Sequence, residues 1–517
     1  MTYLAVPIAA KEYDEATRQI NAAIAKQAEL IELRTDYILS LNVELVQKLI
    51  NYARNASEKP LPLIITCRSK SQGGAIDYPD KTRIEILVAA IKAGVDFVDF
   101  EYESFRDMNN QEKIRLVLSQ YSKTKLILSA HNFKERFDDL AGLYRHIMAT
   151  YPAAIPKIVY TANHINDCFD ALDLLWRTSG QRIVFAMGQA GFITRILAKK
   201  FGSFVTFASV DNTNATAPGQ ITVEQFRDLY RYDSIDKDTQ LFGVIGDPVA
   251  HSMSPAVFNA CFDKAGSNCL YLPILLQGKT DKFNDFMKSV IPRRWLGFKG
   301  FSVTIPHKEN AINFVTHRQG YVEPLAEIIG SANTLVLGPD DNVSTYNTDY
   351  VGVLESIAAA GFKDLQGKKA AVIGAGGVAR AVVAGLVSAA AKVKLYNRTV
   401  RKAERLAAEF KCDFAPLSDL DTVDAELLVN CTSIGMSPDI DKTPIPGEYL
   451  KKTMTVFDTV YNPPQTKLLR DAKTAKAKTI SGVDMFISQA AEQYKLFTGK
   501  DADKKLMKKV VSEHLQC

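Results

Sequence analysis

Lys157 lies inside an apolar run, IPKIVYTA, where an unpaired charge is costly to bury. If Arg34, Arg68 and Arg195 share its surroundings, burial and like charge favour the neutral amine near pH 7. A neutral lysine amine is a nucleophile that forms a Schiff base with a carbonyl substrate. The alternative is that the side chain extends from the end of the strand to water. The periodicity of the run does not distinguish a buried nucleophile from such a solvated lysine.

His131, in SAHNF, is the candidate for proton transfer beside that lysine. A Schiff-base iminium needs a proton removed from the adjacent carbon, and imidazole suits this task near neutral pH. A lone histidine is more often a structural residue. Its expected place in the same barrel mouth as Lys157 and the arginines favours the acid/base role.

A second set of reactive side chains follows between residues 246 and 353. Lys308, in FSVTIPHKEN, and Asp349, in YNTDYVGV, can exchange a proton with a hydroxyl that becomes a ketone during hydride transfer. The alternative is an ordinary surface ion pair. The stretch GDPVAHSMSP carries Ser252 and Ser254 but no lysine or arginine, and it is either a simple turn or a loop that holds a ligand through hydroxyls.

Residues 368–387, KKAAVIGAGGVARAVVAGLV, have the G-x-G-x-x-A pattern in a strand, turn and helix context. Gly374, Gly376, Gly377 and Ala379 form this pattern, which lets the backbone approach a pyrophosphate at the helix N-terminus. The sequence therefore predicts a dinucleotide-binding domain.

The next strand-like run, KVKLYNRT, ends on Asn397, Arg398 and Thr399. A site for NAD would carry an acidic residue here to accept from the ribose 2′-hydroxyl. An arginine instead favours a 2′-phosphate, so the predicted cofactor is NADP.

Eight short apolar runs alternate with helix-like segments over roughly the first 230 residues, a rhythm typical of parallel strands joined by helices. Eight such units predict a (β/α)₈ barrel, whose active site lies at the carboxyl ends of the strands. The side chains expected there are Glu32, Arg34, Arg68, His131, Lys157, Arg195 and Gln220.

The whole chain limits the possible functions. Its 517 residues exceed what one core supports, and 47% hydrophobic with 23% charged residues indicates several folded domains. The net charge of +5, without a long basic stripe, argues against nucleic acid as a partner. No apolar run reaches the length of a membrane span, and no leader or transit segment is expected at the N-terminus.

Seven scattered cysteines, at 67, 168, 261, 269, 412, 431 and 517, never show C-x-x-C spacing. This argues against a disulfide framework or a metal site and predicts a reducing, cytoplasmic location.

The motifs IELRTD, SAHNF, PKIVYT, MGQAGFITR and ATAPGQ together resemble type I 3-dehydroquinate dehydratase over nearly all of residues 1–235. The resemblance implies that Lys157 forms an imine with the C3 ketone of 3-dehydroquinate, His131 moves the protons, and Arg195 grips the carboxylate. It also implies pocket-lining roles for Glu32, Arg34, Arg68, Met187, Thr216 and Gln220.

Two positions depart from that family's pattern. Gln72 stands where the family usually has a glutamate four residues after the arginine, and Thr216 replaces a serine. Both keep a hydrogen-bonding side chain, but Gln72 lacks the negative charge, so the assisting role near His131 is expected to differ.

The series GDPVAHSMSP, VTIPHK, ANT, NTD, GAGGVARA, NRT, NCTSIGM and GVDMFISQAA resembles shikimate dehydrogenase from residue 241 to about 500. The resemblance implies that Lys308 and Asp349 are catalytic and that Asn397, Arg398 and Thr399 hold the cofactor phosphate. It implies substrate contacts for Ser252, Ser254, Thr304, Asn333, Tyr461 and Gln489. The intact Ser-x-Ser pair favours shikimate over quinate.

Joined in this order, the two halves resemble bifunctional dehydratase/dehydrogenases that carry out consecutive steps, with 3-dehydroquinate, 3-dehydroshikimate and shikimate as small-molecule ligands. The expected architecture is α/β. It comprises a (β/α)₈ (TIM) barrel at 1–235, a substrate-binding domain at 241–350 completed by helices at about 483–517, and a Rossmann NADP-binding domain at 351–482. The alternatives are a non-catalytic metabolite sensor on the same domains, a class I aldolase-like barrel, and a quinate dehydrogenase in the second half.

Overall fold

The computed structural model describes residues 1–517 except 212, 214–215, 218 and 516–517. The chain divides into two compact units, Met1–Thr239 with Ile274–Gln277, and Gln240–Pro273 with Gly278–Cys517. None of the six described cysteines is joined in a disulfide bond, and Cys517 lies outside the described residues. None of the described helices is long and apolar enough to cross a membrane.

The first unit is built around an eight-stranded parallel sheet with the order β7-β6-β5-β4-β3-β2-β1-β8. A backbone bond from Phe204 N to Arg182 O, 2.6 Å long, joins the two ends of this order, so the barrel is nearly closed. The strands are β1 Tyr3–Ile8, β2 Leu30–Arg34, β3 Leu63–Thr66, β4 Phe97–Glu101, β5 Lys125–Asn132, β6 Ile155–Thr161, β7 Ile183–Met187 and β8 Val205–Phe207. The predicted βα barrel is confirmed.

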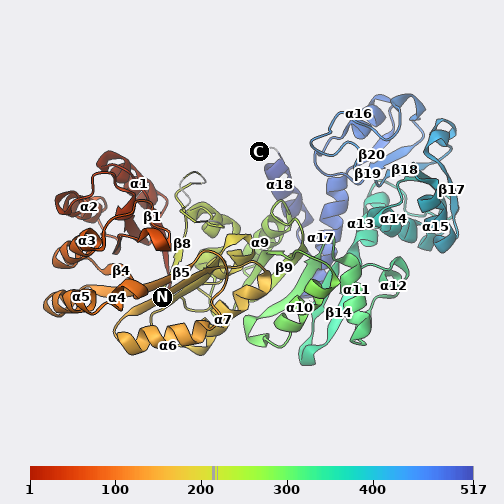
Figure 1. The fold of residues 1–517 in the computed structure, drawn as a ribbon. Helices are drawn as coiled ribbons and strands as arrows, with labels where there is room; N and C mark the ends of the chain where they lie inside the picture. Colours follow the sequence, from red (N-terminus) through yellow and green to blue (C-terminus); the bar gives the residue numbers. More distant parts are fainter. Residues whose placement is uncertain (212, 214–215, 218, 516–517) are drawn as a thin grey trace. The chain divides into compact units, whose positions relative to one another are not determined.

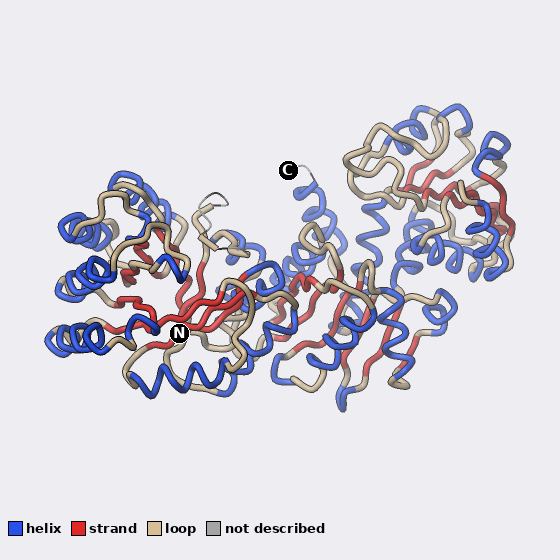
Figure 2. Tube along the Cα trace, in the orientation of Figure 1, coloured by secondary structure: helices blue, strands red, loops and turns tan. Residues whose placement is uncertain are grey.

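Helices surround these strands, as Figure 1 and Figure 2 show for the N-terminal part of the chain. They are α1 Tyr13–Ala25, α2 Val43–Asn55, α3 Asp80–Lys92, α4 Tyr102–Phe105, α5 Met108–Gln120, α6 Leu140–Thr150, α7 Cys168–Arg177 and α8 Gly188–Ile196. Helix α2 illustrates their sequence logic, because the Asn42 side chain caps it by accepting from Leu45 N and its buried residues recur at helical spacing.

The polar segment at 231–239 is a short linker that leads from the barrel into the second unit, and it is packed against the barrel. Tyr232 and Ile235 are buried within it. Lys199 Nζ donates to the backbone carbonyls of Tyr232 and Asp233, and Lys200 Nζ donates to those of residues 237 and 239. This polar linker therefore contains two buried apolar side chains, and hydrogen bonds from two lysine side chains fix its backbone.

The second unit contains two sheets. The first has the order β10-β9-β11-β13-β14-β12 and mixes parallel and antiparallel pairs. Its strands are β9 Gln240–Gly246, β10 Cys269–Leu275, β11 Phe298–Val303, β12 Tyr321–Val322, β13 Thr334–Leu337 and β14 Val343–Tyr346. Its helices are α9 Ser254–Lys264, α10 Thr280–Val290, α11 Lys308–His317 and α12 Pro324–Ile329.

The second sheet is parallel with the order β17-β16-β15-β18-β19-β20, in which the chain turns back at β15 as in dinucleotide-binding folds. Its strands are β15 Lys369–Ile373, β16 Lys392–Asn397, β17 Asp413–Pro416, β18 Leu427–Asn430, β19 Thr455–Asp458 and β20 Lys478–Ile480. The remaining helices are α13 Thr348–Ala359, α14 Gly377–Ser388, α15 Val400–Phe410, α16 Lys467–Thr474, α17 Gly482–Thr498 and α18 Lys504–Leu515. The predicted Rossmann fold is confirmed.

The two C-terminal helices return to the first of these sheets. Val483 and Tyr494 of α17 and Met507 of α18 share one buried cluster with Phe242 of β9 and Phe258 of α9. The chain therefore completes the core of residues 240–350 only at its end.

Candidate active sites

The barrel contains a cavity at the carboxyl ends of its strands. All nine residues predicted for this site line it: Glu32, Arg34, Arg68, His131, Lys157, Met187, Arg195, Thr216 and Gln220. The cavity is completed by Gln72, Gly73, Phe133, Val159, Phe185, Phe207 and Ala217. Strands far apart in the sequence thus bring the whole predicted set to one place.

Lys157 is buried in β6, with 4% of its surface exposed, and does not reach bulk water. Its Nζ lies 2.8 Å from Asp99 Oδ2 and 3.5 Å from Glu32 Oε1. It also lies 4.7 Å from the centre of the Phe207 ring. The sequence analysis placed Glu32 in this pocket but named only arginines as the charges that act on the lysine, whereas its nearest charged groups are the carboxylates of Asp99 and Glu32.

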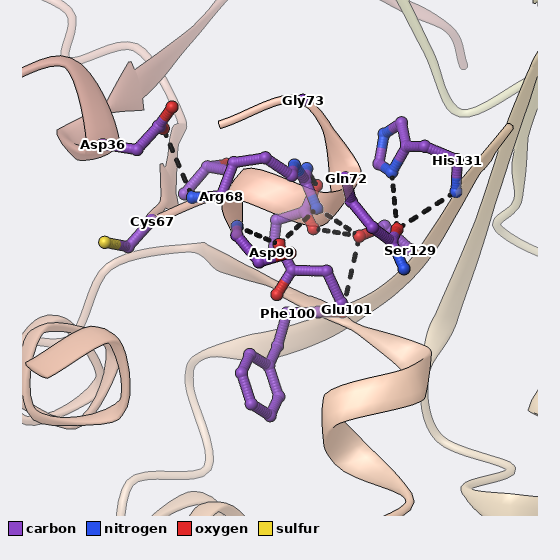
Figure 3. Close-up of polar contacts among 12 residues, drawn as sticks. Asp36, Cys67, Arg68, Gln72, Gly73, Asp99, Phe100, Glu101, Ser129 and His131 are labelled. Atoms are coloured by element: carbon purple, nitrogen blue, oxygen red, sulfur yellow. Dashed lines mark hydrogen bonds and ion pairs between the residues drawn. The ribbon is translucent and has the colours of Figure 1, made fainter. Parts of the chain in front are cut away.

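Asp99 of β4 connects Lys157 to the arginine side of the cavity, as Figure 3 shows in part. Arg68 Nη2 donates to Asp99 Oδ2 at 2.7 Å, and Ser129 Oγ donates to Asp99 Oδ1 at 2.6 Å. Burial acts to raise the pKa of Asp99, but Arg68 and Lys157 outweigh it and lower that pKa below its ordinary value. Asp99 is therefore an anion shared by two buried cations.

Glu101, two residues further along β4, fixes Arg68 from the other side. Its Oε1 accepts from Arg68 Nη1 at 3.1 Å and from the backbone N of Ser69 at 2.9 Å, and its Oε2 pairs with Arg83. Sequence reasoning missed Asp99 and Glu101, although acidic residues at alternate positions in the apolar run FVDFE were a usable signal.

His131 lies at the carboxyl end of β5, and its surroundings disfavour the imidazolium form. Burial, Arg68 and Lys157 lower the pKa of His131 well below 6.5, and Asp99 opposes them only in part. Gln72 Oε1 lies 3.1 Å from His131 Nδ1, and the Phe133 ring stacks beside the imidazole at 6.1 Å between centroids. Neutral imidazole can act as a base near pH 7.

Arg195, in α8, is a buried cation with no carboxylate partner among the described residues. It is 2% exposed, stands over the Phe185 ring at 4.5 Å, and its Nε and Nη2 have no hydrogen-bond partner. The neighbouring Gln220 also leaves Nε2 without a partner, while its Oε1 accepts from the backbone N of Thr216 at 2.8 Å. Unsatisfied buried donors of this kind indicate an anionic ligand.

In the second unit, Lys308 at the start of α11 and Asp349 in the first turn of α13 form an ion pair of 2.6 Å between Nζ and Oδ2. Asn333 Nδ2 donates to Asp349 Oδ1 at 2.9 Å and to Gln489 Oε1 at 3.4 Å. Four of the predicted residues are thus joined by direct contacts.

The other predicted substrate contacts come from three separate segments of the second unit. Ser252 Oγ accepts from Ser254 N at 3.3 Å, at the start of α9. Thr304 follows β11 and packs closely on Gly246, where an added Cβ would lie 2.4 Å from Thr304 Cγ2. Tyr461 follows β19, and its ring lies 5.8 Å from that of Phe486 in α17. No hydrogen bond among the described residues joins Tyr461 to the other members.

The glycine-rich turn lies between β15 and α14. Gly374 has φ +114°, and a Cβ there would lie 3.1 Å from the carbonyl oxygen of Cys431. A Cβ on Gly376 or Gly377 would meet no heavy atom within 4 Å, which leaves open space beside the N-terminus of α14. This cradle fits a pyrophosphate.

Asn397 ends β16, and its Nδ2 donates to the Thr399 carbonyl at 2.9 Å. Arg398 is exposed, and Ala379 is fully buried where α14 packs on the sheet. No three described His, Cys, Asp or Glu side chains are grouped so as to hold a metal ion.

Family models match both units. The model of type I 3-dehydroquinase matches residues 4–237. In the second unit, the shikimate dehydrogenase substrate binding domain matches 244–335, shikimate/quinate 5-dehydrogenase matches 356–445, and the shikimate 5′-dehydrogenase C-terminal domain matches 482–511. Fold and site therefore define a dehydroquinase barrel joined to a shikimate dehydrogenase.

Individual relatives extend this match. The chloroplastic bifunctional 3-dehydroquinate dehydratase/shikimate dehydrogenase of Arabidopsis thaliana is 33% identical over 99% of this chain and 84% of its own length. Shikimate dehydrogenase (NADP(+)) of Methanosarcina acetivorans is 40% identical over 54% of this chain and 99% of its own. A crystal structure of a shikimate dehydrogenase in complex with NADP⁺ aligns with a TM-score of 0.50 and 34% identity, covering 54% of this chain and 97% of that one.

The chain belongs to the bifunctional 3-dehydroquinate dehydratase/shikimate dehydrogenase family. The prediction of an enzyme with a lyase barrel and an oxidoreductase module is confirmed. The predicted cofactor, NADP, is the one named for the matched shikimate dehydrogenases.

Proposed function

We propose that the barrel dehydrates 3-dehydroquinate through a Schiff base on Lys157. The observation that carries this proposal is the buried Lys157 paired with Asp99 and Glu32 in the cavity that also holds His131. When an ammonium group condenses with a ketone, the products are water and a protonated iminium, so the positive charge stays on the same nitrogen. The carboxylates therefore face the amine before condensation and the iminium afterwards, and they stabilise both.

His131 then removes a proton from the carbon next to the iminium, which acts as the electron sink. The electron pair of that C–H bond forms the new double bond and expels the β-hydroxyl, which leaves as water after receiving a proton from the imidazolium. Hydrolysis of the product iminium restores the Lys157 ammonium. Because the pKa of His131 is lowered, the base is already in its neutral form at pH 7.

Arg195 binds the substrate carboxylate in this proposal. Its Nε and Nη2 are buried donors without partners, and a carboxylate can accept from both at once. Thr216 and Gln220 lie in the same cavity wall and supply neutral hydrogen bonds.

Reductive trapping tests the Schiff base. Borohydride added during turnover should attach the ligand covalently to the peptide that contains Lys157, as read by mass spectrometry. Lys157→Ala should abolish both the adduct and dehydration, whereas Lys134→Ala, which removes an exposed lysine three residues after His131, should change neither. Dehydration by Lys157→Ala at the parent rate would refute the mechanism.

We further propose that the second unit reduces 3-dehydroshikimate to shikimate with NADPH. Lys308 and Asp349, held 2.6 Å apart, exchange the proton at the carbonyl oxygen, and Asn333, which also donates to Gln489, keeps Asp349 in place. Ser252 and Ser254 hold the carboxylate through hydroxyls at the N-terminus of α9, where the helix dipole favours negative charge.

NADPH supplies the hydride when it is bound. The glycine turn before α14 would cradle the pyrophosphate, and Arg398 with Asn397 and Thr399 would hold the 2′-phosphate. The exposed Arg398 has no ion pair among the described residues and stands directly after β16, where an NAD site would carry an acid.

A coupled assay separates this proposal from the alternatives. When 3-dehydroquinate and NADPH are supplied, the two activities together should lower the absorbance of NADPH and yield shikimate. A metabolite sensor would bind these ligands without turnover, and a quinate dehydrogenase would oxidise quinate faster than shikimate. Either result would overturn the assignment of the second unit.

We also propose that the functional domains follow this division. The dehydratase occupies 1–235, the substrate-binding part of the dehydrogenase occupies 241–350 with the helices at about 483–517, and the cofactor-binding part occupies 351–482. The buried cluster that joins α17 and α18 to β9 and α9 supports assigning the C-terminal helices to the substrate-binding part.

A further inference from the structure

We propose that Gln72 is a positioning residue that holds His131 in a single tautomer and, because it carries no charge, keeps this imidazole unprotonated in the resting enzyme, before proton transfer begins. The inference rests on the proposed proton transfer by His131. It concerns the side chain at which this chain departs from the glutamate expected from the family resemblance.

The tautomer follows from two hydrogen bonds that meet at one atom. Gln72 Oε1 lies 3.1 Å from the backbone N of His131 and 3.1 Å from His131 Nδ1, and Figure 3 shows both contacts converging on it. A backbone N–H only donates, so the Gln72 atom that faces it must be the amide oxygen. An amide oxygen only accepts, so His131 Nδ1 must carry the hydrogen.

The other ring nitrogen is then the base. In a neutral imidazole with hydrogen on Nδ1, the lone pair is on Nε2. Among the described residues, Nε2 of His131 has no hydrogen-bond partner, and His131 lines the cavity. The stacked Phe133 ring, tilted by 13° from the imidazole, restrains its plane. Gln72 therefore presents an unprotonated Nε2 to the ligand.

Gln72 is itself held by the loop between β3 and α3. The backbone N of Gly74 donates to Ser69 O at 2.8 Å, and that of Ala75 donates to Asp36 Oδ2 at 3.0 Å. Gly73, at φ +87°, packs so closely on Phe133 that an added Cβ would lie 2.3 Å from the ring. These contacts hold the backbone on both sides of Gln72, and they therefore fix the position of its side chain.

The charge of residue 72 sets how easily His131 protonates. The charged groups that face His131 are Arg34 of β2, Arg68 just after β3, Asp99 of β4 and Lys157 of β6, three cations and one anion. Burial and these cations lower the pKa of His131. A carboxylate at position 72 would add an anion at Nδ1 and stabilise the imidazolium, whereas the amide does not.

Gln72→Glu tests the charge, and Gln72→Met tests the acceptor. The acidic limb of the pH profile of kcat/KM reports the base of the free enzyme. Gln72→Glu should move this limb upward by about one pH unit or more, as an added opposite charge does. Gln72→Met should lower kcat about ten- to hundredfold, part of the factor that proton transfer contributes. Ser71→Glu adds the same charge at the neighbouring exposed residue and should leave the limb in place.

The tautomer is measured without turnover. Long-range ¹H–¹⁵N spectra of the full chain with labelled histidine should show the Nδ1–H form for the signal lost in His131→Asn, and a mixture of tautomers in Gln72→Met. Amide hydrogen exchange of the barrel strands reports folding of every variant. An Nε2–H signal in the parent, or coincident acidic limbs for the parent and Gln72→Glu, would overturn the inference. If His131→Asn still dehydrates at the parent rate, the proposed function itself fails, whatever the tautomer.

Discussion

Arg195 provides the sharpest test of the barrel site because its removal should have opposite effects on stability and on binding. Burial lowers the pKa of Arg195 from its ordinary 12.5 to about 10. At 1.36 kcal/mol for each pH unit, the fold disfavours this guanidinium by about 3 kcal/mol. This cost is present below pH 10, where Arg195 is charged in both states. It is relieved as the pH rises from about 10 toward 12.5, because the folded chain then loses its proton first.

Arg195→Met removes the buried charge and keeps most of the side-chain volume. Losing the cation–π contact with Phe185 offsets about 1 kcal/mol of the stability gained by removing the buried charge. A contact between the methionine sulfur and the ring restores part of that loss. We therefore expect the free energy of unfolding of the ligand-free barrel to rise by about 1 to 2 kcal/mol. The KM for 3-dehydroquinate should rise about 10- to 150-fold, because a charge-assisted hydrogen bond contributes roughly 1.5 to 3 kcal/mol.

Arg182→Met is the matched control. Arg182 is also buried, and burial lowers its pKa, but its Nη1 and Nη2 donate to the carbonyls of Gly180, Gly202 and Leu175. Its removal should destabilise the barrel and leave the KM unchanged. Calorimetry and hydrogen exchange of the ligand-free protein measure stability, and dehydration kinetics measure binding. A ligand-free Arg195→Met protein less stable than the parent, with an unchanged KM, would refute the reasoning.

Three further predictions follow from the two sites. Arg398→Ala should raise the KM for NADPH about 10- to 150-fold and leave that for NADH nearly unchanged, and equal losses in steady-state kinetics would contradict the 2′-phosphate assignment. Lys308→Ala should abolish NADPH oxidation yet leave dehydration intact, and loss of both activities in a folded protein would show that the sites are coupled. Asp99→Asn should reduce dehydration and lower the unfolding free energy by about 3 to 5 kcal/mol, because two buried cations lose their shared anion. Because the pKa of Asp99 is lowered in the folded protein, the stabilisation by its carboxylate is present above pH 4 and lost in stronger acid. The unfolding free energies of the parent and of Asp99→Asn should therefore converge when both proteins are titrated with acid.

The sequence was sufficient for the folds because their signals are local. Each apolar run of the barrel marks one strand, and the glycine pattern at Gly374 marks one turn. The lining of the barrel cavity was also predictable, because one rule places the residues after every parallel strand at the same end. Arg195 and Gln220 could therefore be assigned to the same cavity as Glu32 without knowledge of any contact.

The charge network could not be predicted in this way because it depends on register between strands. Glu101 of β4 pairs with Ser129 of β5, and Ser129 pairs with Lys157 of β6. This register brings Asp99, also on β4, to within 2.8 Å of Lys157 Nζ. A run of alternating residues shows that Asp99 and Glu101 share a face, but not which cation lies opposite. The linker is a similar case, since its polar sequence gave no sign that Lys199 and Lys200 hold it.

The two sites differ in how they would receive a carboxylate, and the difference follows from their surroundings. In the barrel, Lys157 and Arg68 are already paired with carboxylates, so without a further cation the ligand's carboxylate would face Glu32 and Asp99 with no unpaired positive charge beside it. Arg195 would supply that charge, and it stays available because no carboxylate among the described residues pairs with it. In the second unit, Ser252 and Ser254 lie at the N-terminus of α9, where the helix dipole already gives a positive potential. Hydroxyls suffice there, since the ligand itself supplies the charge that strengthens each hydrogen bond.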